Sequence, residues 1–137
     1  MYSNKFTFGK KERLCSRKAI SGLFEKGHSF YSHPFRVLWM VSGDDQHYPV
    51  RTGISAGKKS IPRAVDRNRV KRLVRETWRM NKHILYRQLE QLDMKLVIMI
   101  IYSGNTVPEY RDIEAGMNKL VRNFSLHLAR FPEGKKT

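Results

Sequence analysis

The spacing of apolar residues predicts a helix near each end of the chain. Ser16 is a favourable N-cap and Gly27 a favourable stop, so a short helix is predicted between them. Its apolar residues share one face: Ile20, Leu23 and Phe24. Pro108 and Glu109 open a last helix, in which apolar residues recur at helical spacing. These residues are Ile113, Met117, Leu120, Val121, Phe124 and Leu128.

Three segments between these two helices have the character of strands. Residues 35–42, "FRVLWMVS", alternate and are rich in strand-forming side chains. A polar turn at 43–48, "GDDQHY", joins them to "PVRTGISA" at 49–56, and this order predicts a β-hairpin. Residues 94–102, "MKLVIMIIY", are apolar on both faces, which is typical of a buried strand.

A long helix is predicted between the second and third of these strands. It begins near Ala64 or Val65, just after Pro62, and is expected to run towards Leu89. The order helix, two or three strands, helix, strand, helix predicts a layered α/β sandwich with one small sheet. A length of 137 residues suits a single domain, with basic tails at about 1–8 and 130–137.

The long helix separates its apolar residues from its charges. At 100° per residue, one arc collects residues that suit a buried face. They are Val70, Leu73, Val74, Thr77, Asn81 and Ile84, with Trp78 and Met80 at the borders. The opposite arc is cationic and holds Asn68, Arg69, Lys71, Arg72, Arg75, Arg79 and Lys82. Glu76 is the only acid among them, whereas an ordinary solvated helix mixes both signs.

The overall charge indicates the partner of this face. The chain has 27 Lys and Arg against 12 Asp and Glu, a net charge of +15, which attracts polyanions. Most cations on the helix are arginines, whose planar fork suits phosphate oxygens and base edges. Lys58, Lys59 and Arg63 lie just upstream. Nucleic acid is therefore the leading partner, and an anionic membrane surface is the second.

No catalytic or metal-binding motif is visible. The five histidines share no ligand spacing with Cys15 or with one another, and no nucleophile has a paired base. Cys15 is the only cysteine, which fits a reducing compartment. The longest apolar run, residues 96–102, is too short to cross a bilayer, and no signal peptide is recognisable. We therefore expect a soluble cytoplasmic protein.

One stretch of the basic helix has a specific resemblance. Residues 67–76, "RNRVKRLVRE", closely resemble the signature of the protein subunit of bacterial ribonuclease P. Residues 10–30, "KKERLCSRKAISGLFEKGHSF", resemble the opening segment of that family, and "GISAGKK" at 53–59 resembles its strand end before the signature. The similarity extends from about Phe8 to Leu128.

This resemblance implies a fold and an activity. The fold is an α+β two-layer sandwich, with three helices on a small, mostly antiparallel four-stranded sheet and a left-handed β-α-β crossover, as in a ribosomal protein. Because such crossovers are almost always right-handed, the sequence pattern alone predicts the opposite hand. The implied partner is a large catalytic RNA, which with Mg²⁺ removes the 5′ leader from precursor tRNA; the protein alone binds no cofactor, and neither membrane nor DNA is expected as a partner.

The resemblance also implies two sets of binding residues. Those implied to dock on the catalytic RNA are Arg67, Asn68, Arg69, Lys71, Arg72, Arg75 and Arg79. Those implied to receive the single-stranded leader are Phe24, Phe35 and Val37 as a floor, with Lys58, Lys59 and Arg13. Ile20 and Leu38 stand where the family often has aromatic residues, and the link "SIPRAV" at 60–65 is one residue longer than usual.

Two other functions are compatible with the basic composition of the chain. One is a ribosomal or other structured-RNA-binding protein on this fold with no associated enzymatic activity. The other is a DNA-binding protein whose helix reads the major groove, although no helix-turn-helix pair or dimerisation seam is visible.

Overall fold

The computed structural model describes residues 8–14, 16–43, 46 and 48–130. Cys15, the middle of the predicted turn at 43–48 and most of the two predicted tails lie outside these residues. The elements are η1 (Lys10–Glu12), α1 (Arg17–Lys26), β1 (His28–Ser32), β2 (Phe35–Val41), β3 (Val50–Ala56), α2 (Ala64–Asn81), α3 (His83–Leu92), β4 (Leu96–Tyr102) and α4 (Tyr110–Ala129).

The strands form one mixed sheet in the order β1-β2-β4-β3. β2 pairs antiparallel with β1 and with β4, whereas β3 pairs parallel with β4. The predicted hairpin between residues 35–42 and 49–56 is therefore wrong, because β4 lies between the two strands. β4 is buried along its length except at Ile101, which is partly exposed, and a strand that is apolar on both faces takes a central place.

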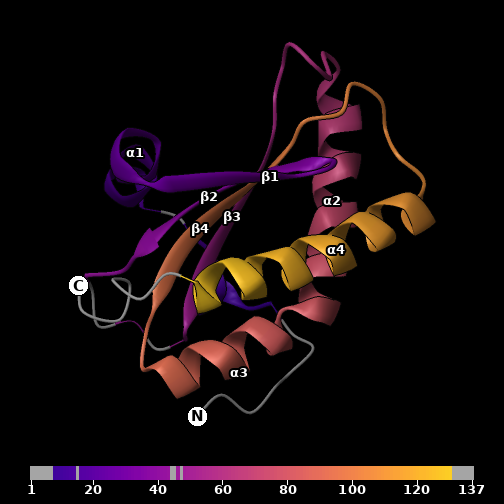
Figure 1. Cartoon of the computed structure of the whole chain (residues 1–137). Helices are drawn as coiled ribbons and strands as arrows, with labels where there is room; N and C mark the ends of the chain where they lie inside the picture. Colours follow the sequence, from indigo (N-terminus) through magenta and orange to yellow (C-terminus); the bar gives the residue numbers. More distant parts are fainter. Residues whose placement is uncertain (1–7, 15, 44–45, 47, 131–137) are drawn as a thin grey trace.

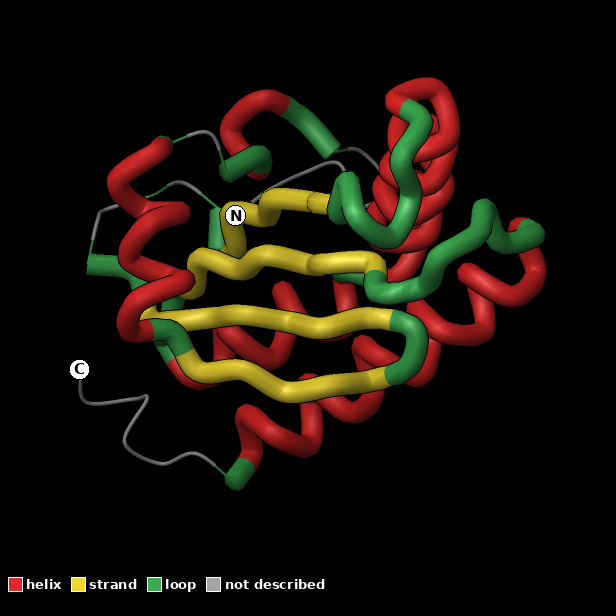
Figure 2. Tube along the Cα trace, turned by 90° about the horizontal axis from the view of Figure 1, so that it is seen from above, coloured by secondary structure: helices red, strands yellow, loops and turns green. Residues whose placement is uncertain are grey.

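Helices cover the two faces of the sheet unequally. α2, α3 and α4 pack on one face and enclose the larger core, whereas α1 lies across the strand ends on the other (Figures 1 and 2). Side chains on β2 alternate between the two: Trp39 belongs to the larger core, and Leu38 packs under α1. The expected α+β sandwich is confirmed.

The connection from β3 to β4 is left-handed. The side chain of Thr52 falls between Val50 and Ala56 in the alternation and so faces the helix layer with them. Its carbonyl accepts a hydrogen bond from Leu14 N–H, on the edge of β3 away from β4. Consider a strand of L-residues that runs upward, viewed with the side chain of one residue pointing at the viewer. The N–H and C=O of that residue then point to the right. β4 therefore lies left of β3 behind the helices, against the usual hand.

The predicted long helix is two helices. α2 ends at Asn81 and α3 begins at His83, and the two run in different directions in Figure 1. Lys82 at the junction keeps helical dihedrals, and its side chain is buried against Glu12. The prediction failed here because the bend is set by a contact with a residue 70 positions earlier.

The other predicted helices are confirmed. Ser16 caps α1, since its Oγ accepts a hydrogen bond from Ala19 N–H at 3.2 Å. α4 begins at Tyr110, directly after its N-cap Glu109. The short edge strand β1 was not predicted as a separate element. Within the described part of the chain, no helix combines the length and apolarity needed to span a membrane.

Candidate nucleic-acid interface

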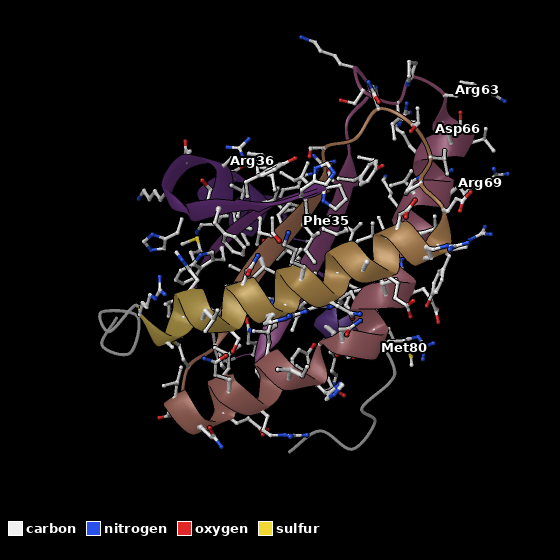
Figure 3. All side chains as sticks on the ribbon, turned by 45° about the vertical axis from the view of Figure 1, so that its right-hand side comes forward. Phe35, Arg36, Arg63, Asp66, Arg69 and Met80 are labelled. Atoms are coloured by element: carbon white, nitrogen blue, oxygen red, sulfur yellow. The ribbon has the colours of Figure 1, made fainter. Side chains whose placement is uncertain are left out.

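α2 presents most of its cations to solvent. Asn68, Arg69, Arg72 and Arg75 are exposed, and Lys71 and Arg79 are partly exposed. Val70, Val74, Thr77 and Trp78 are buried on the opposite side of the helix. Figure 3 shows Arg69 on the side of α2 that is turned away from the sheet. The separation predicted from the helical wheel is confirmed as far as Arg79. It is wrong beyond the end of α2, where Lys82 is buried although it was placed on the cationic arc, and Ile84 is 47% exposed although it was placed on the buried arc.

Few acids neutralise these charges. Arg63 pairs with Asp66 at 3.8 Å, and Arg79 donates to Glu76 one turn before it. Both pairs are local and solvent-accessible, so each contributes at most about 1 kcal/mol. Arg69, Arg72 and Arg75 repel one another in the folded protein, and an anionic partner would relieve that repulsion.

Arg67 differs from the other arginines of α2. Its Nη1 donates hydrogen bonds to the carbonyl oxygens of Ile61 at 3.0 Å and Pro62 at 2.7 Å. Ile61 is 3% exposed and belongs to the larger core. Arg67 therefore fastens the link before α2, and this contact defines the path of the longer "SIPRAV" segment.

A second exposed surface lies on the α1 side of the sheet. The register aligns four residues of one face across the strands, in the order Tyr31, Arg36, Ile101 and Ser55. Arg36 is exposed and the side chain of Tyr31 is 60% exposed. α1 instead covers the next two rows, which contain Leu38 with Met99 and Met40 with Val97. This row, Tyr31–Arg36–Ile101–Ser55, is called the open row below.

Phe24 borders the open row. It is 59% exposed, so it is not a core residue. One flank of α1 carries Ala19 and Gly22, which line a hollow of about 260 Å³ together with Met40. This hollow lies at the end of β2 away from the open row. Phe24 and Ile20 occupy the remaining flank, which faces the open row. Lys58 and Lys59 follow the last residue of β3, at the end of the sheet where the open row lies, and both are exposed.

Phe35 and Val37 are not part of this surface. Both are 0% exposed and lie in the larger core, where the Phe35 ring packs 6.2 Å from that of Tyr102. Because side chains alternate along a strand, a shift of one residue moves a set to the other face. Their neighbours on the α1 side of β2 are Arg36, which is exposed, and Leu38, which is buried under α1. A charged residue between Phe35 and Val37 was the signal that could have fixed the correct face.

Arg13 also lies away from Phe24. It forms a bridge with Thr52 at the outer edge of β3, and the side chain of Thr52 faces the helix layer. The Arg13 guanidinium carbon is 5.6 Å from the centre of the Phe8 ring, which packs against the larger core. The structure therefore does not bring Arg13 together with the α1 flank, because paired residues share one face of a sheet.

The described side chains offer no evident metal centre. Among residues 8–14, 16–43, 46 and 48–130, no three His, Cys, Asp or Glu side chains converge as ligands. Divalent cations in proteins are usually held by several oxygen ligands. What the described surfaces offer instead is cationic and aromatic, which suits phosphates and unpaired bases.

Known proteins share both the sequence and the fold. Residues 8–125 match the sequence model of the family described as Ribonuclease P. The chain belongs to the ribonuclease P protein family. The ribonuclease P protein component of Porphyromonas gingivalis is 37% identical over 115 residues, covering 82% of this chain and 84% of the relative. That of Chlorobaculum tepidum is 31% identical over 130 residues, covering 88% and 84%.

A solved structure agrees with this assignment. The ribonuclease P protein from Thermotoga maritima superposes with a TM-score of 0.62 at 29% identity, covering 84% of this chain and 96% of that one. The protein is thus a component of a ribonucleoprotein endoribonuclease that acts with an RNA subunit in forming the 5′ ends of tRNA. This assignment decides against a ribosomal or a groove-reading DNA-binding protein.

Proposed function

We propose that the exposed cationic face of α2 docks on the RNA subunit of ribonuclease P. The supporting observation is the row of exposed arginines on one helix, with Asp66 and Glu76 as the only acids of α2. Counterion release on phosphate neutralisation makes such a face a binding surface for structured RNA. Arg67 contributes differently, because its Nη1 already holds the link before the helix.

Substitution of single arginines tests the docking face. Arg72→Ala or Arg75→Ala should weaken binding of the RNA subunit by about 1.5–3 kcal/mol, as expected for a charge-assisted hydrogen bond. The log–log salt dependence should also fall by somewhat under about one unit per lost phosphate contact. Arg87→Ala, an exposed arginine on α3, is the matched control. Wild-type affinity of both α2 variants would place the docking face elsewhere.

We propose that the open row and the adjoining flank of α1 receive the single-stranded 5′ leader of precursor tRNA. Arg36 offers a charged fork to phosphates, whereas Tyr31 and Phe24 offer exposed rings to unpaired bases. Lys58 and Lys59 lie at the same end of the sheet and add positive charge. In this proposal Arg36 and Tyr31 replace Phe35 and Val37, which the family resemblance implied as the floor of the leader site.

Leader-dependent binding separates this surface from general charge effects. Arg36→Ala in the assembled enzyme should weaken affinity for precursor tRNA by about 1.5–3 kcal/mol and leave affinity for mature tRNA unchanged. Lys18→Ala is the control, because Lys18 lines the hollow on the other flank of α1. An equal loss for precursor and mature tRNA would contradict leader contact.

We propose that Mg²⁺ acts in the assembled complex and that the RNA subunit carries the catalysis. The carboxylates and histidines of the described chain do not gather into a site, which supports a role in binding and positioning. Titration calorimetry of the protein alone should show no saturable Mg²⁺ site, and protein with Mg²⁺ but no RNA subunit should release no leader. Leader release that survives stringent removal of RNA would contradict this division of labour.

A further inference from the structure

Two oppositely charged side chains are buried at the corner between α2 and α3. Glu12 and Lys82 are each 1% exposed. Lys82 Nζ donates to Glu12 Oε1, and the Tyr86 hydroxyl donates to the same oxygen at 2.7 Å. Glu12 Oε2 accepts a hydrogen bond from Gly9 N–H at 3.0 Å. We call Glu12, Lys82 and Tyr86 the corner cluster.

The corner cluster is not explained by stability alone. Removing two charges from water is costly, and apolar replacements of such pairs are often neutral or stabilising. The cost is visible in Lys82, whose pKa is lowered mainly by burial even though the Glu12 carboxylate acts to raise it. A buried ion pair does, however, demand a defined geometry, because either charge without its partner is strongly destabilising.

That geometry joins the N-terminal segment to the RNA-docking helix. Lys82 donates its backbone N–H to Trp78 O at the end of α2 and accepts from Tyr86 N–H at the start of α3. Glu12 is followed by Arg13 and Leu14, which align with the outer edge of β3 through Leu14 N–H to Thr52 O at 3.0 Å. In Figure 1 the indigo N-terminal segment lies beside the lower end of α2.

The segment held in this way is cationic and lies next to a cationic stripe. Lys10, Lys11 and Arg13 are exposed. One flank of α2 carries Lys71, Arg75 and Trp78, and it continues to Lys82, the C-cap of the helix. These residues follow one another at intervals of four, three and four, and Lys82 keeps helical dihedrals. Because Lys82 on that flank contacts Glu12, the flank is turned towards the N-terminal segment. Lys71 and Arg75 and the three cations of the segment therefore border the same edge of the molecule.

We propose that the corner cluster is a positioning device that fixes residues 8–14 beside α2, so that Lys10, Lys11 and Arg13 extend the α2 face into one continuous docking surface for the RNA subunit. This inference rests on the proposed docking role of α2. Lys82 acts here through the segment that it holds and does not itself contact RNA, since its side chain is buried.

A cycle of variants tests the coupling between the cluster and the segment. Lys10→Ala/Lys11→Ala/Arg13→Ala should weaken binding of the RNA subunit about 10- to 100-fold at moderate salt, because phosphate contacts are lost. Lys82→Met should cause a loss of similar size. The two combined should be no more than about threefold worse than the triple variant, because a displaced segment no longer places its cations. Arg87→Ala/Lys119→Ala/Arg122→Ala, three exposed cations elsewhere, is the charge-matched control.

Hydrogen exchange separates positioning from general destabilisation. In Lys82→Met, the Leu14 amide that donates to Thr52 should lose protection, whereas the amides of β4 and α4 should keep theirs. If Lys82→Met fails to fold, Tyr86→Phe removes one hydrogen bond to Glu12 and should give a smaller, still non-additive loss. Unchanged protection of Leu14, losses that multiply in the combined variant, or wild-type binding by the triple variant would each overturn the inference. If Arg72→Ala and Arg75→Ala also bind normally, the docking role of α2 fails instead.

Discussion

The two faces of the sheet differ in what their side chains do, although the same strands supply both. On the helix-covered face, Phe35, Val37 and Trp39 of β2 are fully buried under α2, α3 and α4. On the other face of β2, Arg36 is exposed, and Leu38 and Met40 lie under the short helix α1. A face covered by three helices stabilises the fold, whereas a face covered by one leaves part of its surface for a ligand. Substitutions of neighbouring residues of β2 should therefore differ in effect: those on the covered face should lower stability, and those on the other face should weaken binding.

The largest effect is expected for Phe35→Ala on the covered face. Emptying a fully buried phenylalanine site should lower the free energy of unfolding by about 3–5 kcal/mol. Arg36→Ala, one residue later and exposed, should change it by less than about 0.5 kcal/mol. Urea denaturation of the two variants checks the contrast, and equal losses would mean that the two faces do not differ in this way.

A smaller difference is expected between two glycines on opposite faces. A Cβ at Gly116 of α4 would lie 2.7 Å from Pro34 Cδ, a rigid ring atom, so Gly116→Ala should cost about 1–3 kcal/mol of stability. A Cβ at Gly53 would lie 2.8 Å from Met99 Cε, the end of a flexible side chain on the α1 side. Gly53→Ala should therefore cost less, because Met99 can move. Thermal melting measures both, and a larger loss at Gly53 would show that the α1 side is the more rigid one.

Phe24→Ala should affect binding rather than stability. An exposed ring that stacks on one unpaired base contributes ~1–3 kcal/mol to affinity. The assembled enzyme should lose that affinity for precursor tRNA with a leader of several nucleotides and keep its affinity for mature tRNA. A large drop in melting temperature with no leader-dependent loss would show that Phe24 supports the fold instead.

The smallest effect concerns the pH dependence of the covered face. His127 of α4 stacks 5.3 Å from the Phe30 ring, and burial, with the charges of His28 and Arg130, lowers its pKa below the usual 6.5. The unfolded chain then binds this proton more readily than the folded one, so stability is full above about pH 6.5 and declines as the pH falls through the folded-state pKa. His127→Phe keeps a stacked ring without a titrating group. Its melting temperature should fall less between pH 7 and pH 5 than that of the wild type.

Several local features could be read from the sequence because neighbouring residues determine them. The cap at Ser16, the last helix after Glu109 and the apolar strand at 96–102 depend on contacts within a few residues or on burial of both faces. The cationic arc of α2 was equally visible, since helical periodicity decides which residues share a side. Arg69, Arg72 and Arg75 are exposed as predicted, and their role in docking remains a proposal.

Other features depended on residues far apart in the chain. The hairpin prediction joined β2 to β3 because they are consecutive, but β4 buries both of its faces only by lying between them. Phe35 and Val37 were assigned to the ligand face, and their alternation alone does not say which face the helices cover. Helix α3 was merged with α2 because the bend at Lys82 is set by a buried contact with Glu12.

The sequence by itself determined the family, the α+β class and the cationic helix, because these follow from a specific signature and from short-range periodicity. It grouped Phe24 with Leu23 on one face of α1, and only the packing of α1 on the sheet separates the buried Leu23 from the exposed Phe24. Tertiary structure alone decided which strand lies at the centre of the sheet, which face remains open, and where Arg13 and Lys82 lie. The physical reason is that burial is settled by the whole set of packed elements. When one strand lies between two others, it changes the neighbours of every residue on both of them. The pattern of apolar and polar residues within each strand does not specify that placement.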